Sequence, residues 1–268
     1  MLEVNNLKVV FNENTNFEKT ALNDVSFKLE PGDFVTVIGS NGAGKSTLFN
    51  ALSGSVEVSS GTIYNNKQNI TYLKDYKRSK FIGRLYQDPF QGTAPNMTIA
   101  ENLGLAFARG KKKALSIAIN GKDKAYFKKI LKALDLGLED RLNSPVKLLS
   151  GGQRQALTLL MATLVTPNLL LLDEHTAALD PKTTLQILAL TQKIVTENKI
   201  TTMMVTHNIE DALKYGNKTF VMNSGQIVLQ LDQKQKQKLE VADVLKLYST
   251  LDIEVSDVNV LPMANKKS

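Results

Sequence analysis

The pattern of apolar and polar positions changes twice along the chain. In the first third, short runs of β-branched and apolar residues between turn signals predict strands. From about residue 88 to 166 the apolar residues recur at helical spacing, and the strand pattern then returns. Leu169–Leu172 and Thr201–Val205 are continuous apolar or β-branched runs, which is typical of parallel strands buried on both faces. The order predicts a sheet domain with a helical insertion.

The boundaries of these elements follow from turn residues and capping signals. The expected strands are Leu7–Phe11, Val25–Leu29, Phe34–Ile38, Gly83–Gln87, Leu169–Leu172 and Thr201–Val205, with a hairpin turn at Ser59–Gly61 before Thr62–Tyr64 and a hairpin over Lys218–Leu229 about Asn223–Gly225. The expected helices are Lys45–Ser53, which Gly54 ends, Ile99–Arg109, Asp123–Leu134, Gln153–Thr166 and Val241–Leu251.

Composition narrows the class of protein. Hydrophobic residues make up 43% and charged residues 22% of 268 residues, an ordinary globular balance. There is no cysteine, which excludes disulfides and thiolate metal sites. The chain has no run of about 18 apolar residues and no signal-peptide pattern at its start. We therefore expect a cytosolic protein, which acts at a membrane only through a partner.

The net charge of +7 is concentrated in one segment. Arg109 to Lys132 holds nine basic residues and one acid, Asp123, a net charge of +8. One interpretation is a solvated helix face and loop; the other is contact with an anionic inner leaflet or with acidic loops of a partner. The basic residues are Arg109, Lys111, Lys112, Lys113, Lys122, Lys124, Lys128, Lys129 and Lys132.

A phosphate-binding motif lies between an expected strand and an expected helix. Gly39-Ser40-Asn41-Gly42-Ala43-Gly44-Lys45-Ser46 fits the pattern G-x-x-x-x-G-K-[ST]. Glycines let the backbone N–H groups wrap closely round a phosphate, and the helix N-terminus adds positive potential. Lys45 would contact the β- and γ-phosphates, and the Ser46 hydroxyl is a ligand for Mg²⁺. The simpler interpretation is a glycine-rich turn before a helix.

A second motif supports the phosphate site. Leu169–Leu172 leads into Asp173 and Glu174, and an apolar strand that ends in a carboxylate is how P-loop enzymes hold Mg²⁺. Asp173 takes that position, and Glu174 lies one residue further, where it would polarise an attacking water. Alone this motif is common; together with the glycine-rich loop it predicts nucleotide chemistry.

A third motif precedes the expected helix at Gln153. In Leu149-Ser150-Gly151-Gly152-Gln153, Ser150 is an N-cap and Ser-x-x-Gln is a capping box. The same helix N-terminus is also a second phosphate-binding end. Since one chain cannot easily bring both ends to one nucleotide, two chains arranged head to tail are expected.

In order along about residues 1–230, these motifs resemble the nucleotide-binding domains of the ATP-binding-cassette (ABC) family. The loop Gly39–Thr47 and the signature Leu149–Gln153 match, Gln87 in Leu85–Pro89 resembles the Q-loop, Ala177–Asp180 the D-loop and His207 the switch histidine. The resemblance implies an α/β P-loop NTPase (RecA-like) core with an antiparallel β subdomain and an inserted α-helical subdomain. The implied boundaries are a cassette over residues 1–250, with its core at 1–87 and 167–250, a helical subdomain at 88–166, and a tail at 251–268.

The resemblance also implies a mechanism and a set of residues. Two subunits sandwich two ATP molecules, Glu174 acts as general base, His207 contacts the γ-phosphate, and Gln87 reports the nucleotide state to a membrane domain. Phe11 is the expected adenine-stacking aromatic, with Phe17 as the alternative. The implied nucleotide contacts are Phe11, Gly39, Ser40, Asn41, Gly42, Ala43, Gly44, Lys45, Ser46, Thr47, Ser150, Gly151, Gly152, Gln153 and Asp180; the implied Mg²⁺ ligands are Ser46, Gln87 and Asp173.

Residue 175 departs from the family pattern. Most cassettes have proline after the glutamate, whereas His175 retains a backbone N–H and adds a group that ordinarily titrates near neutral pH. It is either a tolerated loop variant or a participant at the catalytic centre. The run Asp173–Asp180, together with Gly92–Ile99, resembles the ATPase subunits of bacterial importers for aromatic amino acids of the tryptophan and tyrosine type.

The favoured function is therefore the ATPase of a bacterial importer, at the cytoplasmic face of the cell membrane. Its implied partners are a second nucleotide-binding subunit, integral membrane permease subunits and, indirectly, an extracytoplasmic substrate-binding protein. The alternatives are an exporter with separate membrane subunits and an ABC ATPase acting on nucleic acid. The short spacing of 104 residues between Lys45 and Leu149 leaves no room for the coiled coil of chromosome-type members.

Overall fold

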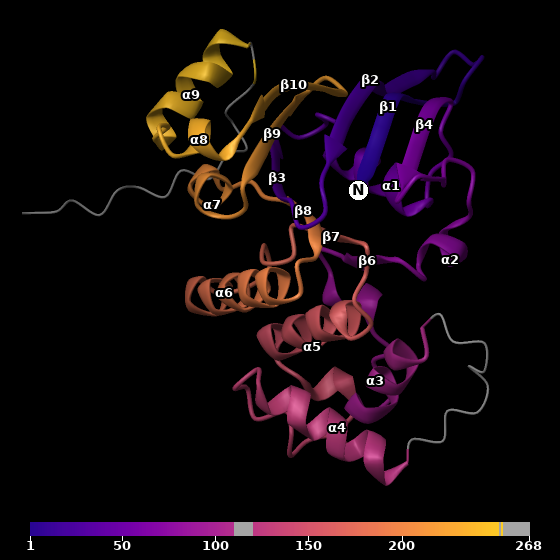
Figure 1. Ribbon diagram of the computed structural model, residues 1–268, viewed down its shortest axis with the longest axis vertical. Coiled ribbons are helices and arrows are strands. Elements are labelled where there is room, and N and C mark those ends of the chain that lie inside the picture. Colours follow the sequence, from indigo (N-terminus) through magenta and orange to yellow (C-terminus); the bar gives the residue numbers. More distant parts are fainter. Residues whose placement is uncertain (110–119, 252, 254–268) are drawn as a thin grey trace, which may run out of the picture. The chain divides into compact units, whose positions relative to one another are not determined.

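The computed structural model describes residues 1–109, 120–251 and 253, which fold into two compact units. The first unit contains Met1–Leu29, Asp33–Tyr72 and the chain from Met203 onward. The second unit contains Glu30–Gly32 and Leu73–Thr202. Each unit has its own sheet strands and helices (Figure 1), so each is described by itself.

The first unit contains an antiparallel sheet with the strand order β2-β1-β4-β5. Its strands are β1 (Leu2–Phe11), β2 (Lys19–Leu29), β4 (Ser60–Asn65) and β5 (Gln68–Asn69). The hairpin turn predicted at Ser59–Gly61 is wrong, because Ser60 and Gly61 already belong to β4 and Ser60 pairs with Lys8 of β1. The tight turn lies six residues later, at Asn66 and Lys67, which have φ angles of 48° and 66°.

The first unit also contains the strand run β10-β9-β3-β8. These strands are β3 (Phe34–Gly39), the last residues of β8 (Thr201–Val205), β9 (Lys218–Asn223) and β10 (Gln226–Leu231). β3 pairs in parallel with β9, and β9 and β10 form the predicted hairpin about Asn223–Gly225. The helices are α1 (Lys45–Ser53), α7 (Ile209–Lys214), α8 (Gln233–Lys236) and α9 (Val241–Thr250).

Helix α9 closes one face of this strand run. Val244 and Tyr248 are buried in a cluster with Ile38 of β3 and Val221 of β9. Apolar side chains from a strand near the start of the chain and from its last helix thus share one core. Burial of side chains of this size stabilises the fold by roughly 1.5–3 kcal/mol each.

The second unit combines two parallel strands with helices (Figure 1). Its strands are β6 (Ile82–Leu85) and β7 (Leu169–Asp173); its helices are α2 (Asp75–Arg78), η1 (Pro89–Gly92), α3 (Ile99–Phe107), α4 (Gly121–Lys132), η2 (Val146–Leu148), α5 (Gly151–Thr163) and α6 (Pro181–Glu197). Helices α3, α4 and α5 enclose a common core that includes Leu103, Phe127, Leu131 and Leu157. The predicted segments at 99, 123 and 153 are therefore helices, each ending two to three residues earlier than expected.

Helix α6 was not among the predicted helices, although it is 17 residues long. Asp180 caps its N-terminus by accepting from the Thr183 N–H, and Pro181 occupies its first turn. Both are standard start signals for a helix. Its buried face contains Ile187, Leu188, Thr191 and Val195.

The basic segment divides into residues with different environments. Five lysines of α4 are exposed: Lys122, Lys124, Lys128, Lys129 and Lys132. Arg109 instead donates to the carbonyl oxygens of Ala162 and Val165 at the end of α5, and burial lowers the pKa of its guanidinium. Arg109 is therefore a structural contact of the helical core and not part of a surface patch. Lys111, Lys112 and Lys113 lie outside the described residues.

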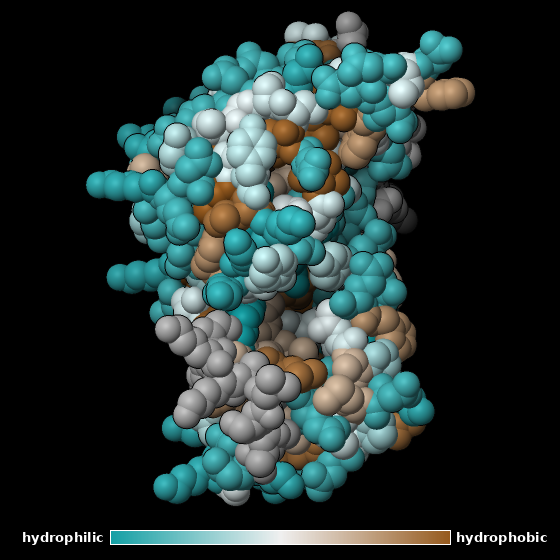
Figure 2. All heavy atoms as spheres, turned by 90° about the vertical axis from the view of Figure 1, so that its right-hand side faces the viewer, coloured by the Kyte–Doolittle hydropathy of each residue, from teal (hydrophilic) through white to brown (hydrophobic). Residues whose placement is uncertain are grey.

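The exposed surface is mixed in character. Figure 2 shows hydrophilic residues spread over the face that it views, with apolar patches between them. Large exposed apolar side chains include Phe17, Leu148 and Leu185. Within the described ranges, no helix is both long enough and apolar enough to span a bilayer.

Candidate nucleotide site

The loop between β3 and α1 requires glycine at two positions. Gly39 has a φ angle of 154°, and a Cβ there would lie 2.2 Å from the carbonyl oxygen of Met222. Gly44 has a φ angle of 99°, and a Cβ there would lie 2.8 Å from the carbonyl oxygen of Ala21. Both positions combine a left-handed conformation with contact to neighbouring backbone, so only glycine fits without displacement. The glycines of the motif thus shape the loop itself.

The β9–β10 hairpin is hydrogen-bonded to this loop. The Gly225 N–H donates to the Ala43 carbonyl at 3.0 Å, and the Asn23 N–H donates to the Gly225 carbonyl at 2.9 Å. Gly225 in turn has a φ angle of 79°, and a Cβ there would lie 2.7 Å from the Ala21 carbonyl oxygen. The loop is therefore fixed by backbone from two distant parts of the chain, β2 and the β9–β10 hairpin.

Helix α1 begins without a capping side chain. Its N-cap is Gly44, so no side chain accepts from the first-turn N–H groups. Lys45 is only 5% exposed, and its ammonium group donates to the carbonyl oxygens of Gly39 and Ser40 at 2.7 and 2.8 Å. An open helix N-terminus beside a buried cation is an anion-binding arrangement. Ser46 is exposed and Thr47 is half-buried in the same turn.

Two further predicted residues belong to the first unit. His207 follows β8, where the Thr206 N–H donates to the Val37 carbonyl of β3 at 3.2 Å. This pairing places His207 beside the end of the strand from which the phosphate loop leaves. Phe11 ends β1 with 38% of its surface exposed, while the alternative Phe17 is 81% exposed.

The second unit brings the two acidic residues and Gln87 to one strand edge. β6 and β7 are parallel and in register, with Leu85 opposite Leu172. Asp173 is the last residue of β7 and Gln87 comes two residues after the end of β6, so both lie at the same edge of the strand pair. Glu174 follows Asp173 with a φ angle of 45°. The two carboxylates thus lie at the carboxyl end of a parallel strand, as the sequence motif predicted.

An arginine that the sequence interpretation missed contacts Asp173. Arg84 of β6 donates from Nη2 to Asp173 Oδ2 at 3.1 Å, and the two side chains are 10% and 14% exposed. Its guanidinium also lies over the Tyr86 ring, 4.6 Å from the centroid. A basic residue within the otherwise apolar run Ile82–Leu85 was a signal that Arg84 has a polar partner, but the run does not show that the partner is Asp173.

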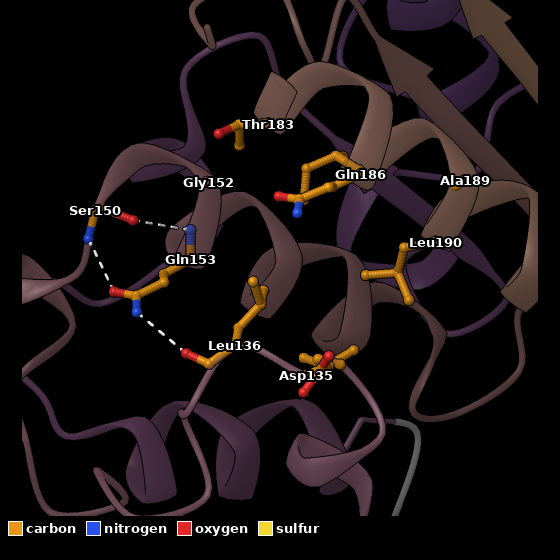
Figure 3. A pocket seen from close by; sticks show the side chains of 11 residues that line it. Asp135, Leu136, Ser150, Gly152, Gln153, Thr183, Gln186, Ala189 and Leu190 are labelled. Carbon is orange, nitrogen blue, oxygen red and sulfur yellow. Dashed lines mark hydrogen bonds between the residues drawn. The ribbon is translucent and has the colours of Figure 1, made fainter. Parts of the chain in front are cut away.

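Helix α5 begins with a complete capping box, as predicted. Ser150 Oγ accepts from the Gln153 N–H at 3.3 Å, and Gln153 Oε1 accepts from the Ser150 N–H at 3.2 Å. The Gln153 amide also donates to the Leu136 carbonyl, and Arg141 donates to its oxygen. Figure 3 shows the two bonds between Ser150 and Gln153 and the bond to Leu136 at one end of a cavity of about 470 Å³, whose opposite wall is α6.

Helix α6 contacts the signature turn directly. A Cβ on Gly152 would lie 2.3 Å from Thr183 Cγ2, so the absence of a side chain allows α6 to approach (Figure 3). Asp180, the last residue of the D-loop motif, is the N-cap of α6, and hydrogen bonds from the Thr183 side chain and backbone lower the pKa of its carboxyl. Helix α6 therefore contacts both motifs: it packs against the signature turn, and its N-cap is the last residue of the D-loop.

The expectation that His175 adds a group titrating near neutral pH is wrong. His175 is 3% exposed, and burial lowers its pKa from the ordinary 6.5 to about 4. Its Nε2 lies 3.2 Å from Thr191 Oγ1 on α6. At neutral pH the imidazole is uncharged and packed inside the second unit.

Taken together, the predicted residues form two groups. The first unit holds Phe11, the loop Gly39–Thr47 and His207, and the second holds Gln87, Ser150–Gln153, Asp173, Glu174 and Asp180. A glycine loop on a helix start, a strand-end carboxylate and a Ser-Gly-Gly-Gln helix start define an ATP-hydrolysing cassette.

The chain belongs to the ABC transporter family, whose model matches residues 22–177, and it is an ATP hydrolase. It is 44% identical over 248 residues to the tyrosine transport ATP-binding protein of Clostridioides difficile, covering 92% of this chain and 98% of that protein. Both the family resemblance and the finer resemblance to a tyrosine transport subunit are therefore confirmed.

Solved structures agree on the fold. The dimeric cassette MJ0796 in a post-hydrolysis state with ADP and Pi is 27% identical, with a TM-score of 0.73 over 87% of this chain and 99% of that one. The protein cbiO1 from Clostridium perfringens, part of the transporter complex cbiONQ, is 26% identical, with a TM-score of 0.74 over 93% and 94%. The predicted α/β P-loop NTPase fold is thus confirmed.

Proposed function

We propose that the chain binds and hydrolyses MgATP as one of two identical subunits that drive an importer for amino acids or similar small solutes. The observation that carries the nucleotide role is the open N-terminus of α1 with Lys45 held at its base. The importer role rests on the relative at 44% identity, a tyrosine transport protein that the chain matches over nearly its whole length.

Nucleotide binding is assigned to the first unit. The N–H groups of Ser40–Thr47 would surround the phosphates, Lys45 would contact the β- and γ-phosphates, and Phe11 would stack on adenine. Ser46, Gln87 and Asp173 would hold Mg²⁺. Their hydroxyl, amide and carboxylate oxygens are hard donors of the kind that Mg²⁺ prefers, and phosphate and water oxygens would complete its shell.

Hydrolysis is assigned to Glu174 and His207. Glu174 would accept a proton from the attacking water as the water oxygen bonds to the γ-phosphorus, and the bond from that phosphorus to the bridging oxygen breaks to release ADP. His207 would donate to a γ-phosphate oxygen. Arg84 shares Asp173 with the metal site, since it bonds the same carboxylate.

The signature turn is assigned to the partner's nucleotide. Ser150–Gln153 begin a helix whose N-terminus favours phosphate, and Asp180 caps the neighbouring helix α6. Two chains placed head to tail would complete two sites, each with one phosphate loop and one signature turn. The dimeric state of the cassette MJ0796 supports this arrangement.

The remaining partners follow from the same assignment. The subunit would bind integral membrane permeases at the cytoplasmic face of the cell membrane, with Gln87 reporting the nucleotide state. The exposed lysines of α4 would face the permease or the anionic leaflet. A substrate-binding protein outside the membrane would supply the cargo.

Replacing Glu174 with Gln tests the assignment of the base. The variant removes the proton acceptor but keeps shape and hydrogen bonding, so turnover should fall by about 100-fold or more while ATP binding stays intact. Steady-state phosphate release and equilibrium MgATP binding measure the two effects, and sedimentation should show an ATP-bound dimer. Hydrolysis at the parental rate would refute the role of Glu174.

A further inference from the structure

His175 occupies a place that the proposed chemistry does not use. It follows Glu174 directly, in the turn that leads from β7 to α6, and it is buried. Because it is not proline, no ring fixes its φ angle. Restraint of this turn must come from hydrogen bonds.

The turn is bonded to itself and to α6. The Ala177 N–H donates to the Glu174 carbonyl at 3.0 Å, and the Leu179 N–H donates to the Thr176 carbonyl at 3.2 Å. Towards α6, the Thr184 hydroxyl donates to the Thr176 carbonyl at 3.4 Å, which is a long bond. The shorter and more buried connection is the one between His175 and Thr191.

The hydrogen-bond directions at Thr191 determine which nitrogen of His175 carries the proton. The Thr191 hydroxyl donates to the Ile187 carbonyl at 2.8 Å, so its single hydrogen is already used. The bond of 3.2 Å to His175 Nε2 therefore runs the other way, from Nε2–H to Thr191 Oγ1. Of the two neutral tautomers of His175, only the one with the proton on Nε2 satisfies both bonds.

We propose that His175 is a positioning residue, which holds the turn that carries Glu174 against α6 through its hydrogen bond to Thr191. Helix α6 is a suitable anchor, because the same helix is capped by Asp180 and packs against Gly152 of the signature turn. One helix thereby sets the positions of the base, the D-loop and the signature turn within one chain. This inference rests on the proposed role of Glu174.

The test uses the full-length protein and the isosteric change Thr191→Val, which removes the acceptor for His175 but keeps the volume. Turnover at saturating MgATP should fall about 10- to 100-fold, as expected for a misplaced catalytic group, with the KM for MgATP unchanged. Thr191→Ser keeps the hydroxyl and should restore turnover. Thr196→Val, at an exposed position near the end of the same helix, is the matched control and should behave as the parent.

A second readout does not depend on activity. Amide hydrogen exchange in the nucleotide-free protein should rise about tenfold in the peptide spanning residues 173–180 of Thr191→Val, since one buried bond is lost. Parental turnover together with parental exchange in that peptide would overturn the proposal. So would an exchange increase spread over the whole chain, which indicates general destabilisation.

The same series separates this inference from the proposed function. If Glu174→Gln is inactive while Thr191→Val has parental turnover and exchange, only the positioning role of the bond between His175 and Thr191 is refuted. If Glu174→Gln hydrolyses ATP at the parental rate, the role of Glu174 is refuted, and the exchange result then reports only whether His175 holds the turn.

Discussion

Two helix N-termini in this molecule are built in opposite ways. Helix α1 begins at Gly44, which has no side chain to cap it, and a buried lysine lies in its first turn. Helix α5 begins at Ser150, where a capping box already uses the Gln153 N–H. The open end provides a cation and unused capping positions for a ligand, whereas at the capped end the Gln153 N–H is already used. This difference supports the proposal that α1 binds phosphate without a partner and that α5 acts on a phosphate bound by the other subunit.

The largest expected effect is the loss of MgATP binding when Lys45, at the N-terminus of α1, is replaced. Lys45→Ala removes the cation of the open end and should weaken MgATP binding by about 30- to 100-fold, the range of a lost charge-assisted bond. Ser150→Arg should leave binding to the single chain unchanged but abolish hydrolysis, because it blocks only the surface offered to a partner's nucleotide. Titration calorimetry and phosphate release measure the two quantities.

Mixing the two variants is the control. A heterodimer of Lys45→Ala and Ser150→Arg keeps one site with an intact loop and an intact signature turn, so activity should return although each variant alone has none. Equal loss of MgATP binding in both variants would contradict the assignment of nucleotide binding to α1 and of the partner's nucleotide to α5.

Lowering the pH should destabilise the folded chain, because His175 in the second unit is buried in its neutral form. Its pKa is about 4 in the folded chain against 6.5 ordinarily, so between these values the unfolded chain binds the proton and the folded chain does not. Stability is therefore full above about pH 6.5 and is lost as pH falls, by about 2 kcal/mol between pH 7.5 and pH 5. Urea unfolding of the parent and of His175→Asn at both pH values measures this loss.

The other histidine of the chain provides the matched control. His207→Asn should keep the acid-dependent loss, whereas His175→Asn should remove it. An unchanged pH dependence in His175→Asn would show that another group is responsible.

The smallest expected effect is the change in the free energy of unfolding when the N-cap of α5 is removed. Ser150→Ala removes the side chain that accepts from Gln153 and should lower the free energy of unfolding by about 1 kcal/mol. Ser46→Ala, a matched change in the first turn of α1, removes no cap and should stay within about 0.5 kcal/mol of the parent. Denaturant unfolding without nucleotide separates the two values.

Short-range patterns predicted most of the fold. Helix α1 has the predicted bounds, and the β9–β10 hairpin turns where Asn223–Gly225 indicated. Leu169–Leu172 of β7 and all of β8 are buried, as expected of central parallel strands. The turn at Ser59–Gly61 failed because pairing with β1 extended the strand through those residues, a long-range interaction that overrode the local turn signal.

The candidate site was predictable as a set of motifs but not as a set of contacts. The glycine loop, Asp173, Glu174 and the capping box are sequence-local features, and the structure places each at the end of the expected strand or helix. The bonds from Arg84 to Asp173 and from His175 to Thr191 join residues far apart in sequence. Spacing alone shows neither that β6 lies beside β7 nor that α6 packs on the turn after β7, so neither bond could be deduced.

The hydrogen bond between the β9–β10 hairpin and the phosphate loop has a consequence for how the protein is made. Gly225 bonds Ala43, and Met222 lies against Gly39, so backbone near residue 225 completes a loop that is translated some 180 residues earlier. A ribosome-bound chain that ends before this hairpin contains every residue of the motif but lacks the backbone that fixes its shape. The bonds that fix the shape of the phosphate loop can thus form only after some 180 further residues have been translated.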